Sequence, residues 1–261
     1  KALGIHNILS FDLMSIPSVP ALCQGLESLF ALGAIDDRTH LTKLGNQMSE
    51  FPTEARVSRM MLKSISLGCP SEILCVASSL QVRALFYQPR TQMQQMDYDS
   101  AMGNLMDSSG DHVTFVNLML SNDDTRLTED DCKERFINYL ALKRAGEVRS
   151  QLTNFLRRYG KIAAMDSTVS LEDKSAAIRK CVTAGFFSNT AKLGSDGHYY
   201  SLRGKQMISI SKASALSKYG LVSEYIIFGE TYDGARGGIE VRSCSSIEGK
   251  WLRELAPHYW A

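Results

Sequence analysis

Apolar residues recur at intervals of three and four positions through most of the first 187 residues. This is the period of helices that bury one face. Beyond residue 187 the pattern changes to short apolar runs separated by glycine-containing turns. The segments 199–202 and 207–210 flank Arg203-Gly204-Lys205 and are typical of a β-hairpin, and 224–228 and 239–244 predict two more strands. The chain is therefore expected to be an α+β protein in which the helices precede the strands.

The first unit, residues 1–52, combines two helices with a short polar connection. Pro20 follows Ser18 and is well placed to begin the first helix, and Thr42 is a candidate N-cap for the second, which Pro52 ends. A helix, a short wing and a helix within about 50 residues favour a small winged-helix-like domain.

Residues 53–163 are expected to form a helical bundle. Thr128 begins a sequence typical of a capping box and predicts the start of one long helix. At roughly 100° per residue, Arg144 and Arg149 flank the apolar stripe of this helix on opposite sides. They are either cations that face a groove or ordinary solvated charges. The stripe consists of Ala141, Ala145, Val148, Leu152, Phe155 and Tyr159.

The segment 90–109 interrupts the bundle with methionine- and glutamine-rich sequence of little periodicity. We expect it to be mobile or to depend on a partner for its structure, since methionine surfaces adapt to different partners.

The last unit, residues 164–261, begins with a polar linker and a helix that ends in Phe186 and Phe187. These two rings are expected to be core anchors of the following β-domain, and Arg179 and Lys180 are the residues of this helix expected to reach RNA or the bundle. About five short strands in 80 residues, closed by a helix near Trp251, predict a small barrel of the OB kind. This fold commonly binds single-stranded nucleic acid.

Composition and motifs exclude several classes of function. The net charge of +1 is low for an autonomous nucleic-acid-binding domain. No phosphate-binding glycine loop, no histidine pair at metal-ligand spacing and no catalytic constellation is present, so we expect neither a catalytic nor a metal site. The glycine-rich run 234–238 lies between strands and predicts a flexible β-connection. The six scattered cysteines are expected to be small buried hydrophobes. No apolar run is long enough to span a bilayer.

Several motifs, taken together and in order, resemble the C-terminal region of DEAH-box RNA helicases of the pre-mRNA-splicing type. The triplet Gly110-Asp111-His112 is similar to the GDH triplet of that family's ratchet domain. The matching segments are 1–5, 29–36, 41–52, 136–152, Ala184-Gly185-Phe186-Phe187 and 251–257. The match covers nearly the whole chain.

The resemblance implies a helical winged-helix and ratchet bundle followed by a small OB-like barrel with a closing helix. It also implies that the ATP-hydrolysing RecA domains, with their ATP and magnesium, lie N-terminal to this segment, which would then need no cofactor and be inactive alone. The sequence begins with Lys1-Ala2-Leu3-Gly4 and not with a methionine, as expected for a piece of a longer protein. The positions expected to contact RNA are Asp111, His112, Arg144, Arg149, Lys180, Lys192, Arg203 and Arg242.

The partners implied by this family are single-stranded RNA, the RecA domains of the same chain and a G-patch protein, with no membrane. The location implied is the nucleus, within the spliceosome. One alternative is a protein-docking scaffold of the G-patch-binding type without direct RNA contact. A second alternative is an independent DNA-binding winged-helix protein, which is disfavoured because Lys43 is the only cation of the second helix.

Overall fold

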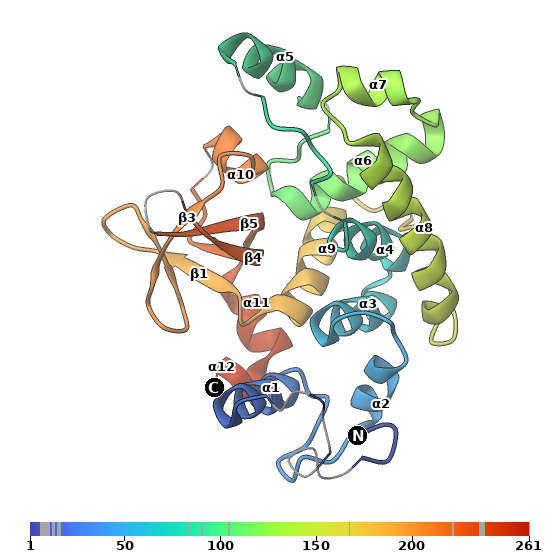
Figure 1. Ribbon diagram of the computed structural model, residues 1–261, viewed down its shortest axis with the longest axis vertical. Coiled ribbons are helices and arrows are strands. Elements are labelled where there is room, and N and C mark those ends of the chain that lie inside the picture. Colours follow the sequence, from blue (N-terminus) through green and yellow to red (C-terminus); the bar gives the residue numbers. More distant parts are fainter. Residues whose placement is uncertain are drawn as a thin grey trace.

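The computed structural model describes residues 1–260 except 6–10, 12–13, 15–16, 83, 90, 104, 167, 221 and 235–237. Helices occupy one side of the molecule and a β-barrel the other, with α9 (Leu171–Phe186) between them (Figure 1). The predicted α+β fold, with helices first and a small barrel last, is confirmed. The domain boundaries 1–52, 53–163 and 164–261 stay predictions.

The first two helices begin at the predicted caps. In α1 (Val19–Ala31) the Ser18 hydroxyl accepts a hydrogen bond from the amide of Ala21, and Pro20 lies in the first turn. In α2 (Lys43–Ser49) the Thr42 hydroxyl accepts from the amide of Gly45 at 2.9 Å. A short bridge between Ile35 and Leu41 forms the wing between them.

The helical bundle contains one more break than predicted. The capping box at Thr128 is present, but its helix ends at Glu134, and a second helix begins at Tyr139. Between them Phe136 adopts a φ of 57° and packs edge-on against the Tyr98 ring. The predicted single helix is therefore wrong. The bundle comprises α3 (Ala55–Leu67), α4 (Pro70–Ser79), α5 (Gln92–Met102), α6 (Asp111–Thr125), α7 (Glu129–Glu134) and α8 (Tyr139–Leu156).

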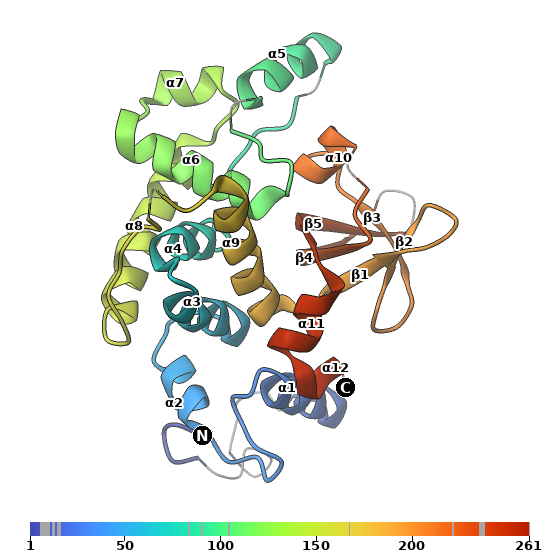
Figure 2. The same cartoon turned by 180° about the vertical axis from the view of Figure 1, so that it is seen from behind.

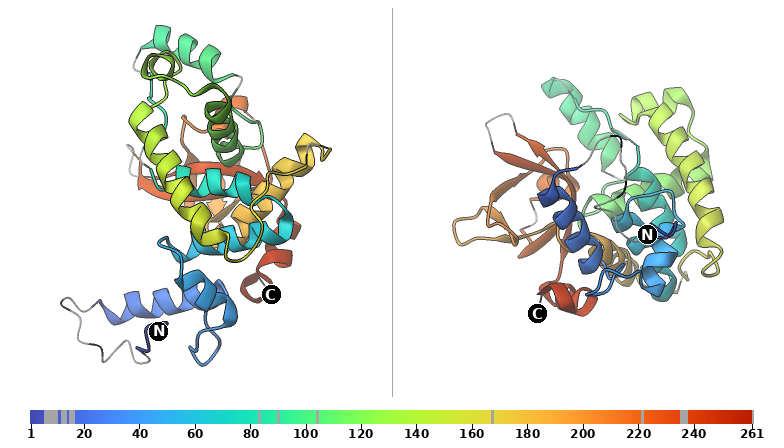
Figure 3. Two further views of the ribbon diagram at one scale, coloured as in Figure 1. Left: turned by 90° about the vertical axis from the view of Figure 1, so that its right-hand side faces the viewer. Right: turned by 60° about the horizontal axis from the view of Figure 1, so that its bottom comes forward.

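The methionine-rich segment forms a helix, α5, at the periphery of the bundle (Figure 3). Tyr98 and Met102, one turn apart, are buried and fix one face of α5 to the molecule. Met93 and Met96 are 77% and 73% exposed. Two anchors at helical spacing hold this helix on the bundle, and mobility or dependence on a partner stays a prediction for the segment.

The main hydrophobic core runs from the winged-helix unit through the bundle to α9 and the closing helix. Gly185 of α9 lies so close to α3 that a Cβ atom there would be 2.3 Å from the carbonyl oxygen of Arg56. Phe186 and Phe187 are buried as predicted, but in this core. This core also contains Ile227 and Ile247 of the barrel strands, so the two rings anchor the barrel to the bundle, while the interior of the barrel has a separate core.

The strands close into a barrel in the order β1-β2-β3-β5-β4. All neighbouring strands are antiparallel except β3 and β5, which are parallel. The predicted hairpin around Gly204 is confirmed by the pairing of Tyr200 with Met207. The central part of the glycine-rich connection, 235–237, lies outside the described residues. The elements are β1 (Thr190–Leu193), β2 (Tyr199–Ser201), β3 (Met207–Ile210), α10 (Ala215–Tyr219), β4 (Tyr225–Asp233) and β5 (Ile239–Ile247).

The chain ends in two short helices that tie the barrel to both helical units. Trp251 of α11 (Gly249–Leu255) is buried in the main core. Pro257 begins α12 (Pro257–Trp260). The Tyr259 ring of α12 packs against Phe187 at a centroid distance of 4.9 Å. From behind, α12 lies beside α1 (Figure 2).

Candidate nucleic-acid interface

The outer face of the barrel collects exposed polar and aromatic side chains. Ala191, Ile208 and Val241 point into the barrel core. Because successive strand residues point to opposite faces, their sequence neighbours point outward. The register then places Lys192 opposite Tyr200, and Tyr200 opposite Met207, in one row across β1, β2 and β3.

A second row crosses the other side of the same face. Ser209 of β3 lies opposite Glu240 of β5, which lies opposite Tyr232 of β4. Arg242 is two residues further along β5, and its guanidinium lies 4.1 Å from the centre of the Tyr232 ring. The face therefore offers Tyr200 and Tyr232 as rings and Lys192 and Arg242 as cations.

Each of these four groups is already bonded to a carboxylate. Lys192 lies 3.3 Å from Glu224, and Arg242 lies 3.8 Å from Glu240. The Tyr200 hydroxyl donates to Asp196 at 2.6 Å, and the Tyr232 hydroxyl donates to Glu230. A phosphate bound here must displace these carboxylates, so the face is suited to weak binding that depends on salt.

Arg203 lies apart from both rows, at the tip of the β2–β3 hairpin. It donates to Glu27 of α1 and to the Tyr259 hydroxyl, both at 3.2 Å. These contacts cross from the barrel to the winged-helix unit and the C-terminal helix. Lys180 lies on α9, 3.9 Å from Glu254, with its ammonium above the Trp251 ring.

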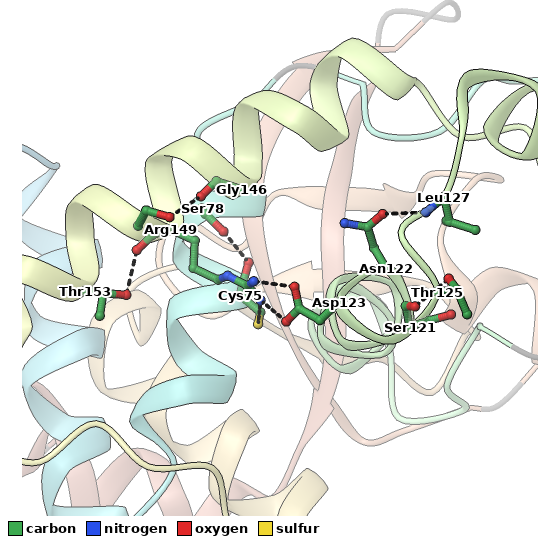
Figure 4. A network of polar contacts seen from close by, with 11 residues as sticks. Cys75, Ser78, Ser121, Asn122, Asp123, Thr125, Leu127, Gly146, Arg149 and Thr153 are labelled. Carbon is green, nitrogen blue, oxygen red and sulfur yellow. Dashed lines mark hydrogen bonds and ion pairs between the residues drawn. The ribbon is translucent and has the colours of Figure 1, made fainter.

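The two arginines of α8 differ in their surroundings. Arg144 is exposed and bonds to Glu147 on the next turn at 3.0 Å. Arg149 donates hydrogen bonds from both terminal nitrogens to Asp123 of α6, at 2.5 and 2.8 Å. One of these nitrogens also donates to the Cys75 sulfur of α4 (Figure 4). This bidentate contact raises the pKa of Arg149 and joins three helices.

Asp111 and His112 are buried in a joint between the bundle and the barrel. The two carboxylate oxygens of Asp111 accept hydrogen bonds from the amides of Ala215 and Cys244, both at 2.7 Å. Asp111 therefore binds α10 and β5 and does not cap α6, its own helix. His112 Nδ1 lies 2.8 Å from the Ser245 hydroxyl, and its Nε2 has no hydrogen-bond partner among the described residues.

Burial lowers the pKa of His112 to about 3 and raises that of Asp111 to about 6. Neither side chain reaches the surface. A phosphate therefore has no access at this joint to the N-terminus of α6, the helix that Asp111 begins. The eight predicted residues thus do not form one site. Lys192 and Arg242 both point outward from the barrel, in different rows, and the other six are distributed over the joint, α8, α9 and the hairpin tip. Contact of any of them with RNA stays a prediction.

The buried His112 predicts a pH dependence of stability. Its pKa lies below the value of about 6.5 expected in the unfolded chain, so its neutral form stabilises the fold above that pH. This contribution falls by about 1.4 kcal/mol for each pH unit below about 6.5. The stability difference between the wild type and His112→Asn should therefore shrink by about 2 kcal/mol from about pH 7 to about pH 5. Urea unfolding at both pH values measures it, and parallel changes in the two proteins would contradict the assignment.

Tyr200 and Tyr232 are the residues of this face that sequence reasoning missed. Tyr200 lies in the predicted hairpin, where alternation from Tyr199 could have placed it outward. Tyr232 falls beyond the predicted end of its strand. Within the described residues, no three histidine, cysteine or acidic side chains are grouped so that they could hold a metal ion, and no helix is long and apolar enough to cross a membrane.

Comparison with known proteins identifies three successive domains. Residues 25–53 match the helicase-associated winged-helix domain, 54–115 the helicase-associated ratchet-like domain, and 178–259 the oligonucleotide/oligosaccharide-binding fold. The chain is 34% identical, over all of its 261 residues, to a probable ATP-dependent RNA helicase DHX35 homolog of Caenorhabditis elegans. It spans 34% of the length of that relative.

Proposed function

Because the chain is the accessory C-terminal region of a DEAH-type RNA helicase, we propose that it holds single-stranded RNA on the outer face of its barrel. The observation that carries this proposal is the strand register, which points Lys192, Tyr200, Tyr232 and Arg242 outward from an OB fold in two rows that meet at β3. Bases would stack on the two rings while the two cations bind the phosphates. Such contacts are tolerant of sequence, since every base presents a stacking face.

The mechanism follows from the carboxylates on this face. RNA phosphates compete with Glu224 for Lys192 and with Glu240 for Arg242. The fragment should therefore bind RNA weakly, and the remaining cations of the binding channel would come from the helicase core. In the whole protein, the joint at Asp111 would hold the barrel at a fixed angle to the ratchet bundle, so that RNA on the barrel and movement of the core remain coupled.

Removing a competing carboxylate provides the test. Glu240→Gln and Glu224→Gln should each raise the affinity for oligouridylate about threefold at low salt, because an exposed ion pair contributes up to about 1 kcal/mol. Fluorescence anisotropy measures this change. Glu248→Gln is the matched control, since Glu248 pairs with Lys250 at 2.6 Å and lies outside the two rows. Equal gains in all three variants would reflect net charge alone and contradict the proposed face.

For the whole protein, we propose ATP hydrolysis by N-terminal RecA domains, with ATP and magnesium bound there, and a role in pre-mRNA splicing in the nucleus. The sequence motifs of the splicing-type subgroup support this role. A G-patch protein is the proposed activator. An upstream GxxxxGK[ST] loop and DEAH segment in the full-length gene would support the motor, and their absence would contradict it.

A second candidate function is a protein-docking scaffold. The exposed Met93 and Met96 of α5 favour it, since methionine side chains adapt to varied partners. Recovery of the same partners with and without nuclease treatment would support docking, whereas loss of all partners after nuclease would support RNA binding.

A further inference from the structure

One half of β4 has a strand on only one side. β1 pairs with β4 through Tyr225–Ile227 and no further, whereas β5 pairs with it as far as Asp233. The last backbone hydrogen bond on the β1 side runs from the Phe228 amide to the Asn189 carbonyl, at 3.0 Å. Before Asn189 the chain turns away into α9. No described strand occupies the position beside residues 230–233, which are all exposed.

This vacant strand position is a cleft of about 440 Å³. Its lining comes from the edge of β4, from Asn189 just before β1, and from Arg56 in the first turn of α3. Asn189 donates its side-chain amide to the Gly229 carbonyl at 3.1 Å, so a side chain already bonds to this edge. The lining residues are Arg56, Asn189, Gly229, Glu230, Thr231 and Tyr232.

Arg56 gives the cleft a positive wall. Its guanidinium lies 5.2 Å from the centre of the Phe186 ring and bonds to Glu54 at 3.0 Å. The Glu54 side chain is 68% exposed, so this pair is open to exchange with another carboxylate. Glu230 is the acidic residue of the lining, and it already accepts a hydrogen bond from the Tyr232 hydroxyl of the same strand.

We infer that this cleft binds an extended, acidic peptide segment of a partner protein, which adds as a strand to the edge of β4. An open strand edge offers both N–H donors and carbonyl acceptors, which matches the backbone of a peptide. RNA phosphates only accept hydrogen bonds. They could not donate to the strand carbonyls, and the Glu230 carboxylate would repel them. A carboxylate on the peptide would take the place of Glu54 on Arg56. The site adjoins the RNA-binding face of the proposed function and shares Tyr232 with it, but its peptide would bind through the edge of β4 and Arg56, which that face does not use.

The probe is a short capped peptide that alternates threonine and valine around one central glutamate. Amide NMR shifts of the full 261-residue chain should change at Asn189 and Gly229–Tyr232 when the peptide is added. A copy of the peptide with alternate backbone nitrogens methylated should lose at least tenfold in affinity, because its hydrogen bonds to the edge are blocked. Arg56→Gln should weaken the unmodified peptide several-fold.

Arg158→Gln is the matched control, since Arg158 also pairs with a glutamate, Glu50, and lies over a phenylalanine ring, Phe155. Its affinity for the peptide should equal that of the wild type. The inference is overturned if the methylated peptide binds equally well, if the shifts lie elsewhere, or if neither peptide binds. It is also overturned if oligouridylate, and not the peptide, shifts Asn189, Gly229 and Thr231, the cleft residues that the proposed RNA-binding face does not include.

Discussion

Replacing Gly110 by alanine should destabilise the protein by about 3 kcal/mol, because backbone strain and overpacking each cost about 1–3 kcal/mol. Gly110 has a φ of 131°, and an added Cβ would lie 2.4 Å from the Cys244 carbonyl oxygen and 2.5 Å from Ser245 Cα. Both neighbours are backbone atoms of β5 and cannot rotate away. The substitution would separate the joint that Asp111 and His112 form. Urea unfolding gives the change in free energy.

Gly146→Ala is the control for this experiment. Gly146 lies inside α8, and a Cβ atom there would have no neighbour within 4 Å. Alanine at this helix position should stabilise by about 0.5–1 kcal/mol, because the unfolded chain loses conformational freedom. Similar stabilities for the two variants would contradict the close packing of Gly110 against the backbone of β5.

The double variant Lys192→Ala/Arg242→Ala should bind oligouridylate about tenfold more weakly at low salt, as expected when two phosphate contacts are lost. It should also reduce the slope of log affinity against log salt by about 1.4, since each single-strand phosphate contact contributes about 0.7. Anisotropy titrations at several salt concentrations measure both quantities. The expected slope change identifies direct phosphate contacts, which a folding defect would not mimic.

Arg144→Ala/Arg149→Ala is the informative comparison. Arg149 is engaged by Asp123 and Cys75, so its loss should lower stability and leave the salt slope nearly unchanged. The slope of log affinity against log salt could instead fall in this variant and not in Lys192→Ala/Arg242→Ala. The RNA contacts would then lie on the ratchet bundle, and the proposal that RNA binds the outer face of the barrel would be wrong.

Local features of the fold could be predicted because their causes lie within a few residues. The caps at Ser18, Thr42 and Thr128 each bond to an amide three positions ahead. The hairpin around Gly204 is likewise fixed by its turn. By contrast, the break before α8 has one local sign, the cap at Asn138, while Phe136 at the break packs on Tyr98, a residue far away in sequence.

The candidate site was less predictable for the same physical reason. Asp111 carries the features of a cap, but its partners are 104 and 133 residues away. Arg149 has the position of a groove-facing cation, but Asp123 on another helix binds it. Strand alternation can place Lys192 and Arg242 outward, but only the pairing register shows which rings lie beside them.

The central claim is that RNA lies on the outer face of the barrel, and photo-crosslinking tests it most directly. Oligouridylate carrying a photoreactive base should be bound to the wild-type chain, irradiated and located by mass spectrometry of the peptides. RNA on the outer face of the barrel should give adducts at Tyr200, Met207 and Tyr232, with few on α8. Adducts confined to the ratchet helices, with none on these strands, would contradict it.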